Sequence, residues 1–517
     1  MKNRNDKLLI AAFIVLSVIL YFVSIKQNNF IRTKYVSFGN VDSNCFVEKT
    51  NLKDNEIVKK YSKYNYLKLD IIQKVTPVTS QELKDIIKNT KKNQFSYGII
   101  LDNKIVLLVE EVNANEIIDY DTEEIDITRL NQLLKEKKIN QTYTFIPNIS
   151  LFETESKFYK NNHWISLTLK NGFHKENEYN LKEVIQNSAT TLMNMNQSNG
   201  EFIYGYSANS GDQINSYNIL RHAGSTWSLI LYYEQYPNEE LKQKIQRSIQ
   251  YLINNYLVKY NENISLVIEK KGNEIKLGGN ALTLLMLSDY KRVFDDNQYD
   301  DVSSKIANGI LWMQQDSGKF NHVLSEDFTL KDEYRTVYYD GEATYALLKY
   351  YGLSKNEIYL NQAMKAIDYF IDHHYEQYRD HWTSYAIKEL LLYNQDQKYI
   401  EFAFNNFKSN ISRLNIEGFG PIRLELVLST YSSYQYLSSI QSSVIQNFDL
   451  ESLKKSININ YEELMDYYID EEEAMYFKNP IVVQYGFQDI TDGFRMRIDD
   501  IQHSLLAIMM YEKYLEE

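Results

Sequence analysis

The sequence predicts a mainly α-helical protein in which a small α+β region precedes a much larger helical region. Its 517 residues include only 5 prolines and 18 glycines, so few residues interrupt long helices. Polar-faced and more apolar helical runs alternate from about residue 180 onward, whereas residues 66–175 contain short runs rich in β-branched residues. With 44% hydrophobic residues the chain is too apolar for disorder, and its length predicts more than one domain.

The amino-terminal stretch LLIAAFIVLSVILYFVSI, residues 8–25, carries no charged residue. At about 1.5 Å per residue it is long enough to cross a hydrocarbon core of roughly 30 Å. No small-residue cleavage pattern follows it, which favours an uncleaved transmembrane signal anchor over a removed signal peptide. The sequence therefore predicts a short cytoplasmic tail over residues 1–7, the membrane as a partner of this helix, and a single-pass membrane location with a large extracytoplasmic body.

A polar linker is predicted over residues 26–65 and a small α+β domain over residues 66–175. The stretch QFSYGIILDNKIVLLVEEVN holds two β-rich runs around the turn DNK, and HWISLTLKNGFH reads as a strand with an NG turn. Between them IDITRLNQLLKEK reads as a short helix. The stretches VNANEIIDYD and FYKNNHWISLTLKNGFH resemble the β-rich domain of the AMME syndrome candidate-gene family, a resemblance from which no function is carried over.

From residue 180 to 517 the chain is repetitive, as the alignment of LMNMNQSNGEF with LWMQQDSGKF shows. Polar-faced helical runs lie near residues 181–196, 239–256, 299–315, 357–374, 397–413 and 456–476. More apolar runs begin near Ser216, Gly279, Tyr338, His381, Gly420 and Asp499. Six such pairs predict an (α/α)6 toroid with the apolar helices inside, because a helix that is apolar nearly all round must be buried. An open solenoid is the alternative, but the uneven spacing of the inner starts favours a ring with inserted loops on one face.

Polar and charged residues stand at the start of nearly every predicted inner helix. One such residue alone is explained as a helix cap or as a hydrogen-bonded core histidine. Their conjunction at several starts favours a functional cleft, because burying so many unpaired ionisable groups would cost several kcal/mol each. The predicted catalytic residues are Asp340, Glu342, Asp500, His222 and His503. The predicted substrate-binding residues are Asn218, Arg221, Asn280, Tyr339, His381, Trp382, Tyr385, Glu389, Arg423, Glu425, Arg497 and Gln502.

The motifs YNILRHAGSTWSL, DGEATYALL and RIDDIQHSLLAI, with the six-hairpin pattern, resemble the six-hairpin glycosidase-like superfamily. That superfamily comprises (α/α)6 toroids that are glycoside hydrolases, polysaccharide lyases and sugar epimerases. The resemblance covers about residues 180–517 and implies the fold and a carbohydrate substrate. It does not imply one reaction, because one fold hosts several chemistries.

Three functions remain open from the sequence. Hydrolysis needs two carboxylates beside the glycosidic bond, and Asp340, Glu342, Glu389, Glu425 and Asp500 are the candidates. A polysaccharide lyase or uronate epimerase needs a base and a cationic or amide partner for the carboxylate, for which the candidates are His222, His503, Tyr339, Arg221, Asn218 and Arg497. Because carboxylates outnumber bases, the sequence favours a membrane-anchored glycoside hydrolase acting on a cell-envelope or exported polysaccharide or oligosaccharide. The third function is a non-catalytic glycan-binding or assembly protein, with an exopolysaccharide export or synthesis complex as partner.

The sequence argues against several classes of function. A net charge of -13 without a basic stripe argues against nucleic-acid binding. No cofactor is predicted, because glycine-rich phosphate loops and a GxSxG elbow are missing from the sequence. No metal site is predicted either, since Cys45 is the single cysteine and His373 and His374 are adjacent rather than one helical turn apart. The charge run at residues 470–474 is predicted to lie on a solvated face.

Overall fold

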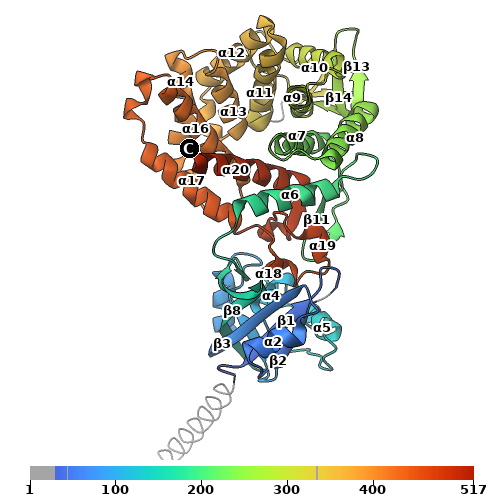
Figure 1. Ribbon diagram of the computed structural model, residues 1–517, viewed down its shortest axis with the longest axis vertical. Coiled ribbons are helices and arrows are strands. Elements are labelled where there is room, and N and C mark those ends of the chain that lie inside the picture. The colour runs from blue at the N-terminus through green and yellow to red at the C-terminus, as the bar shows by residue number, and fades with distance from the viewer. Residues whose placement is uncertain (1–29, 44, 333–335) are drawn as a thin grey trace, which may run out of the picture.

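The structure is a computed structural model that describes residues 30–43, 45–332 and 336–517. An amino-terminal α+β region lies beneath a ring of helices, and the chain passes from one to the other after β10 (Figure 1). Residues 8–25, on which the predicted membrane helix falls, lie outside this description.

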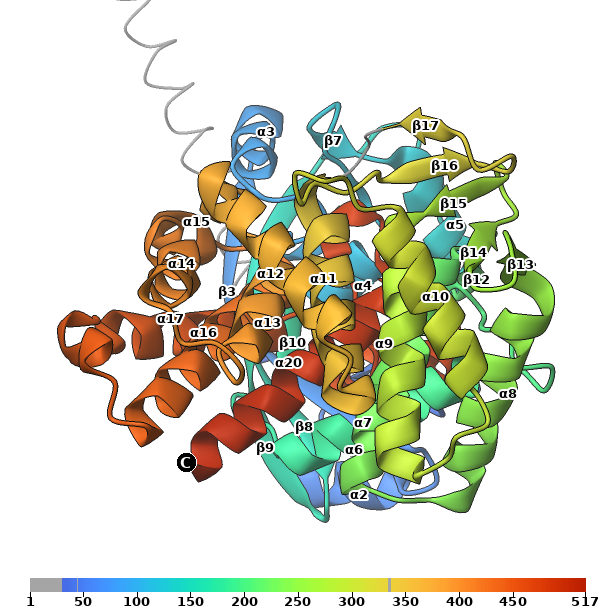
Figure 2. The ribbon, with the colours of Figure 1, turned by 90° about the horizontal axis from the view of Figure 1, so that it is seen from above.

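Twelve helices form the ring, in six outer and inner pairs. The outer helices are α6 (Leu181–Met195), α8 (Glu239–Tyr256), α10 (Asp300–Trp312), α12 (Glu357–Asp372), α14 (Gln397–Lys408) and α17 (Leu450–Met465). The inner helices are α7 (Ile219–Gln235), α9 (Leu277–Phe294), α11 (Thr336–Ser354), α13 (His381–Leu390), α16 (Pro421–Ser439) and α20 (Ile498–Glu516). Each inner helix contacts the next in chain order, and α20 contacts both α16 and α7, so the ring is closed (Figure 1). Figure 2 shows α9, α10 and α11 lengthwise and side by side. This confirms the predicted toroid.

Insertions precede the inner helices, as the sequence predicts. Strands β13 (Leu257–Lys259), β14 (Ser265–Glu269), β15 (Glu274–Lys276), β16 (Val323–Ser325) and β17 (Leu330–Asp332) form one antiparallel sheet before α9 and α11. Strands β11 (Gly205–Ser207), β12 (Asp212–Gln213) and β18 (Arg495–Arg497) form a second sheet that joins the segments before α7 and α20. Short helical turns fill the other connections: η1 (Tyr375–Tyr378), α15 (Ile411–Leu414), η2 (Ser443–Asn447), α18 (Glu471–Ala474), α19 (Pro480–Val483) and η3 (Ile490–Asp492).

The amino-terminal region is built on an antiparallel sheet with the strand order β10-β9-β8-β3-β1-β2, to which β4 and β5 are added at β8. Its strands are β1 (Lys34–Gly39), β2 (Phe46–Thr50), β3 (Tyr66–Val78), β4 (Gly98–Leu101), β5 (Ile105–Leu107), β8 (Ile149–Lys160), β9 (His163–Lys170) and β10 (Phe173–Lys175), with a separate small hairpin of β6 (Ile118–Asp119) and β7 (Glu124–Ile125). Its helices are α2 (Asp54–Tyr61), α3 (Ser80–Lys88), α4 (Val109–Ala114) and α5 (Ile127–Glu136). Where the sequence predicts a linker, over residues 26–65, the structure therefore has β1, β2 and α2. The reason is that β1 pairs along β3 and buries Val36 and Phe38 in this region.

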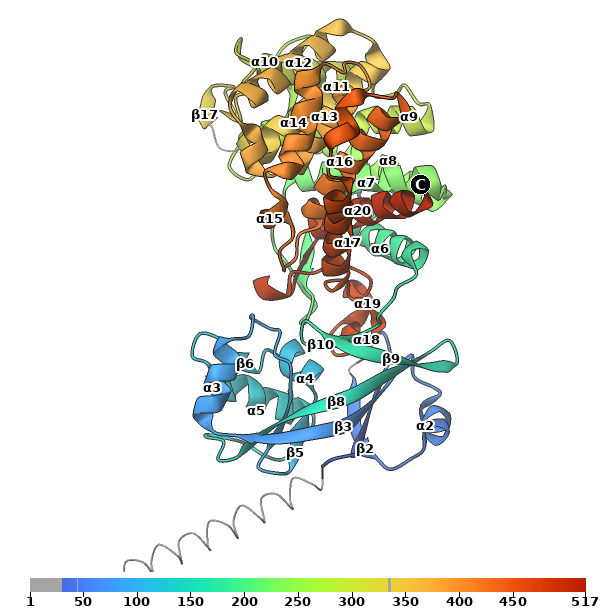
Figure 3. The same ribbon diagram turned by 90° about the vertical axis from the view of Figure 1, so that its left-hand side faces the viewer.

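Helices α18 and α19 lie between the ring and the amino-terminal sheet (Figure 3). Lys175, at the end of β10, donates to Glu473 Oε2 at 2.5 Å and to the carbonyl oxygen of Tyr468 at 2.6 Å. Glu472 and Glu473 are fully buried, so the prediction of a solvated face for residues 470–474 is wrong. A charge run in a connection between two regions becomes buried when the second region covers it, and burial raises the pKa of Glu473 to about 7 despite the Lys175 charge.

The predicted membrane location is corrected. No helix within residues 30–517, as far as the structure describes them, is long and apolar enough to cross a membrane. The single-pass location, the signal anchor and the membrane as a partner have no support in the described residues and are not retained.

Two adjacent glycines at the start of α9 offer a matched test of how closely the inner helices pack. A Cβ on Gly278 would lie 2.2 Å from Glu342 Oε2 and 2.6 Å from the ring of Tyr339, whereas a Cβ on Gly279 would meet only Ile219 at 3.5 Å. We expect Gly278→Ala to lower the free energy of unfolding by about 1–3 kcal/mol through overpacking, and Gly279→Ala to raise it by up to about 1 kcal/mol. Urea unfolding of both variants measures this. Equal stabilisation by the two substitutions would contradict the close approach of α9 and α11.

Candidate active site

Three residues from separate inner helices meet near the helices' amino-terminal ends. His381 begins α13, Glu425 lies in the second turn of α16, and His503 lies in the second turn of α20. His503 Nδ1 is 2.7 Å from Glu425 Oε1, and the two imidazole ring centroids are 5.1 Å apart. Glu425 is fully buried and its second oxygen accepts a 2.6 Å hydrogen bond from the hydroxyl of Tyr385. The cluster is therefore a pair of neighbouring imidazoles, one of which, His503, is hydrogen-bonded to the carboxylate of Glu425.

The pKa values of the two histidines are shifted in opposite directions. Burial alone would lower the pKa of His503, but the charges of Glu425, Asp499 and Asp500 outweigh it and raise that pKa above its ordinary value. Burial and the neighbouring His503 charge instead lower the pKa of His381 well below its ordinary value. A neutral imidazole thus faces one that favours the charged form, which is the arrangement of a base and an acid.

His381 is 2% exposed, yet neither of its ring nitrogens makes a hydrogen bond to any residue that the structure describes. A buried polar group without a partner is rare in folded proteins, and where it occurs it is often a functional group that awaits a ligand. The ring is enclosed by aromatic side chains: Trp382 lies 4.9 Å and Tyr338 5.8 Å from it, centroid to centroid.

Tyr338 is a site residue that the sequence analysis missed. It has a φ of 85°, a left-handed conformation that is costly for a bulky side chain and that interrupts α11. Strained backbone of this kind concentrates at functional sites. The sequence gives no signal for it, because nothing in the run YRTVYYD marks which residue will take a positive φ.

A second layer of charges lies at the start of α20. Arg497 donates to both oxygens of Asp499, each at 2.9 Å, and Arg221 Nε lies 2.8 Å from Asp499 Oδ2. Burial would raise the pKa of Asp499, but the two arginines lower it. Asp500 differs, because burial and the Asp499 charge raise its pKa to about 6, even though Arg495 donates to it. Adjacent carboxylates thus have pKa values pushed in opposite directions.

Several residues predicted for the cleft are instead engaged in packing. His222 is fully buried, with its Nδ1 2.7 Å from the Tyr217 hydroxyl and its Nε2 2.9 Å from the carbonyl oxygen of Ser248 on the outer helix α8. Burial lowers its pKa to about 4. Asp340 is also fully buried, and both of its oxygens are occupied, by His322 Nε2 at 2.8 Å and by the Tyr375 hydroxyl at 2.7 Å. The structure therefore places both residues in the walls of the ring.

The remaining predicted residues divide between the site and its surroundings. Tyr385, Trp382 and Arg221 belong to the two layers described above. Asn218 caps α7 by accepting from the amide of Arg221, and Asn280 bonds the backbone of Val267 in β14. Five further predicted residues lie at other positions of the inner helices: Tyr339 and Glu342 are buried between α9 and α11, Gln502 packs against Gly224 of α7, Arg423 donates to Asn460 of α17, and Glu389 lies in the third turn of α13 near Tyr393.

The same three side chains could hold a metal ion, because their ligand atoms all lie within 4.8 Å of one another. Two imidazoles and a carboxylate are a donor set that suits several divalent metals. The His503–Glu425 contact already satisfies one donor from each of those residues, so a metal would have to displace it. These donors come from three separate helices, so residue spacing within a single segment could not have shown them.

Comparison with known proteins bears on the fold of the ring. No protein-family model matches the sequence, and no curated protein matches it. Among solved structures, a D-mannose isomerase aligns with a TM-score of 0.51 at 11% identity, covering 65% of this chain and 97% of its own. A cellobiose 2-epimerase from Bacillus thermoamylovorans B4167 aligns with a TM-score of 0.50 at 11% identity, covering 64% of this chain and 99% of its own. These likenesses agree with the (α/α)6 toroid that the helices of the ring form.

The buried cap of α13 gives a pH-dependent prediction. Asp380 accepts from the amide of Trp382 at 2.9 Å, and burial raises its pKa from 3.8 to about 6. A carboxyl whose folded pKa is raised contributes stability that is full below pH 3.8 and is lost as pH rises through about 6. Asp380→Asn keeps a capping oxygen without the charge, so we expect it to raise the free energy of unfolding at pH 8 by up to about 3 kcal/mol and to change little at pH 4. Urea unfolding at both pH values checks this, and an equal gain at both would contradict it.

Proposed function

We propose that this protein is a carbohydrate-active enzyme that transfers a proton at a carbon atom of a reducing sugar, as an isomerase or epimerase does. The observation that carries the proposal is the His381 and His503 pair, whose pKa values are shifted in opposite directions. Proton abstraction beside a carbonyl needs a neutral base and a proton donor for the carbonyl oxygen. The names of the two aligned structures, an isomerase and an epimerase, agree with this chemistry.

In the proposed step, the unpartnered nitrogen of neutral His381 takes the proton from the carbon beside the sugar carbonyl. The protonated His503 donates a proton to the carbonyl oxygen, which gives an enediol and leaves His503 neutral and His381 charged. Return of a proton to the same carbon on its other face, while neutral His503 takes back the proton from the enediol oxygen, re-forms the carbonyl and gives the epimer. Return of a proton to the neighbouring carbon, with loss of the proton from the other enediol hydroxyl, gives the isomer. Glu425 orients His503 through its Nδ1, and Tyr385 in turn fixes Glu425, so the acid is positioned from behind.

The surrounding side chains suit a sugar. Tyr338, which is partly exposed, places an aromatic ring beside His381, where the apolar face of a pyranose can stack, while Trp382 is buried and packs against His381 from within the ring. Arg221, Arg497 and Asp499 form a partly exposed hydrogen-bonding layer on the α20 side, with side chains 27%, 20% and 15% exposed. Such a layer can bind ring hydroxyls, and the charge of Asp499 also contributes to the raised pKa of His503.

A glycoside hydrolase is the second candidate, and one observation favours it. The pKa of Asp500 is raised to about 6 while that of the adjacent Asp499 is lowered, so one carboxyl can donate a proton while the other stays ionised. Hydrolases divide the work between two carboxyls in this way. Both carboxylates, however, are paired with arginines, and Asp500 also accepts from the backbone amide of Arg497 at 2.9 Å.

Solvent isotope incorporation separates the two candidates. Incubation of the protein with D-mannose, D-glucose and cellobiose in D2O, followed by NMR of the recovered sugar, reports deuterium at the carbon beside the carbonyl. We expect incorporation with the wild type and a loss of about 100-fold or more in its rate with His381→Gln or His503→Gln. Glu425→Gln keeps the shape of the cluster, so we expect it to reduce kcat while leaving KM nearly unchanged.

The same variants provide the control. Circular dichroism must show that each variant is folded, and Gly279→Ala, which lies outside the cluster, should react at the wild-type rate. Release of new reducing ends from an oligosaccharide, abolished by Asp500→Asn and retained in His381→Gln, would instead establish the hydrolase. Deuterium incorporation that survives both histidine substitutions would remove the histidine pair from the reaction.

A further inference from the structure

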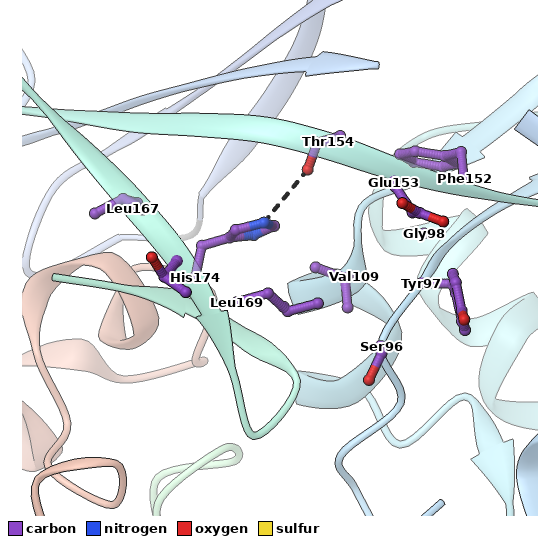
Figure 4. A pocket seen from close by; sticks show the side chains of 11 residues that line it. Ser96, Tyr97, Gly98, Val109, Phe152, Glu153, Thr154, Leu167, Leu169 and His174 are labelled. Atoms are coloured by element: carbon purple, nitrogen blue, oxygen red, sulfur yellow. Dashed lines mark hydrogen bonds between the residues drawn. The ribbon is translucent and has the colours of Figure 1, made fainter. Parts of the chain in front are cut away.

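The amino-terminal region has a cavity of its own, well separated in the sequence from the ring residues. It has a volume of about 510 Å³ and lies between β4, β8, β9 and the start of α4. Its polar lining residues are Ser96, Tyr97, Glu153, Thr154, Thr168 and His174. Figure 4 shows the imidazole of His174 reaching from β10 toward Thr154 on β8, with Tyr97 and Phe152 at the other end of the cavity. A cavity of this size and polarity is large enough for a small ligand.

The cavity exists because the sheet divides along β8. On one edge of β8, Phe152 pairs with Gly98 of β4 and Ser156 pairs with Leu167 of β9. Between these two points, residues 153–155 have no strand opposite them on that edge in the described chain. Gly98 is needed at the fork, since a Cβ there would lie 2.1 Å from the ring of Phe152. The cavity therefore results from the register in which β4 and β9 pair with β8.

A fully buried charge network stands behind His174. Lys68 Nζ lies 2.5 Å from Asp70 Oδ1 and 3.1 Å from Glu110 Oε1, and Glu110 Oε1 lies 2.6 Å from His174 Nδ1. Lys68, Asp70 and Glu110 have no exposed surface, so the desolvation of three charges must be offset by their mutual pairing. Asp70, Glu110 and His174 also have a metal-ligand geometry, but the ammonium of Lys68 already supplies the cation between the two carboxylates.

The hydrogen-bond directions in this network leave one acceptor facing the cavity. Ser156 donates its proton to Asp70 at 2.5 Å, so in its 3.0 Å contact with Thr154 it must accept. The proton of Thr154 is therefore committed to Ser156 and is not given to His174. The contact between Thr154 Oγ1 and His174 Nε2 is 3.5 Å, at the outer limit of a hydrogen bond.

The other side of the imidazole is fixed as well. A carboxylate can only accept, so Glu110 accepts a hydrogen bond from His174 Nδ1, and in this Nδ1–H tautomer of the ring Nε2 carries a lone pair. The imidazole is 5% exposed, and that nitrogen lies at the cavity wall. A purely structural ion network would not require this outward-facing acceptor.

We propose that this cavity is a second binding site, for an uncharged polyhydroxylated ligand of sugar size, in which a ligand hydroxyl donates to His174 Nε2. The lining supplies three aliphatic hydroxyls, which can form hydrogen bonds with ligand hydroxyl groups, and the Tyr97 and Phe152 rings, which can stack on a sugar face. Glu153 can only accept, and its Oε1 already accepts from Lys74 Nζ at 2.8 Å. No arginine or lysine lines the described cavity, so an anionic ligand would find no counter-charge there. The proposal does not depend on the reaction in the ring.

Two exposed positions on β9 give a matched test. Thr168 lines the cavity, whereas Ser166, two residues earlier on the same strand, does not, and both side chains are exposed, so tryptophan at either is compatible with folding. Saturation-transfer NMR on the full chain with D-glucose, D-mannose and cellobiose as probes measures sugar binding. We expect Thr168→Trp to fill the cavity and weaken binding by about tenfold or more, and Ser166→Trp to leave it unchanged.

Further outcomes distinguish sugar binding in this cavity from sugar binding in the ring. Binding should persist in a folded His503→Gln variant, and the imidazole nitrogen shifts of His174 should move when sugar is added to that variant. Sugar binding that is lost in His503→Gln and unaffected by Thr168→Trp would overturn the proposal. Preferential binding of methylammonium, displaced by Thr168→Trp, would also overturn it, because the ligand would then be a cation held by Glu153.

Discussion

The packing of α20 between α7 and α16 is the constraint on which the rest of the molecule depends. These helices are far apart in the sequence, and their contact closes the ring. Polar groups from the consecutive inner helices α13, α16 and α20 meet near the amino-terminal ends of these helices. Closure adds the contact of α20 with α7, which places Arg221 Nε 2.8 Å from Asp499 Oδ2, and the close approach at Gly278 indicates how little room the inner helices leave between them. An open array of the same hairpins would keep the histidine cluster but would separate Arg221 from Asp499.

Buried ionisable groups occur in two kinds of surroundings in this structure. Around Asp340 and Glu473 each charge has close partners, and the groups hold helices and regions together. Around His174 the supporting network is also complete, but Nε2 is left at the cavity wall. His381 is buried, and neither of its ring nitrogens is hydrogen-bonded to a described residue. Completed networks stabilise, whereas each proposed site contains a histidine nitrogen that is available to a ligand.

The amino-terminal region is joined to the ring through polar contacts that are themselves buried. Lys175 reaches Glu473, and Tyr66 donates to Gln484 at 2.5 Å. These contacts fall in the connection between α17 and α20, the same segment that ends at the charged layer of Arg497 and Asp499. The sheet therefore supports the loop from which one side of the candidate active site is built.

The sequence by itself determined the helical pairs and the ring, because the apolar periodicity of inner helices and the polar faces of outer ones are local properties of the chain. It also placed His381, Glu425 and His503 among the polar helix starts. Tertiary structure alone decided their partners. His222 and Asp340 carry the same chemistry as His503 and Glu425, but their side chains point into the ring wall, and no residue spacing encodes that direction. The buried Glu473, the strained Tyr338 and the fork in the sheet at Gly98 likewise arise from contacts between segments distant in the sequence.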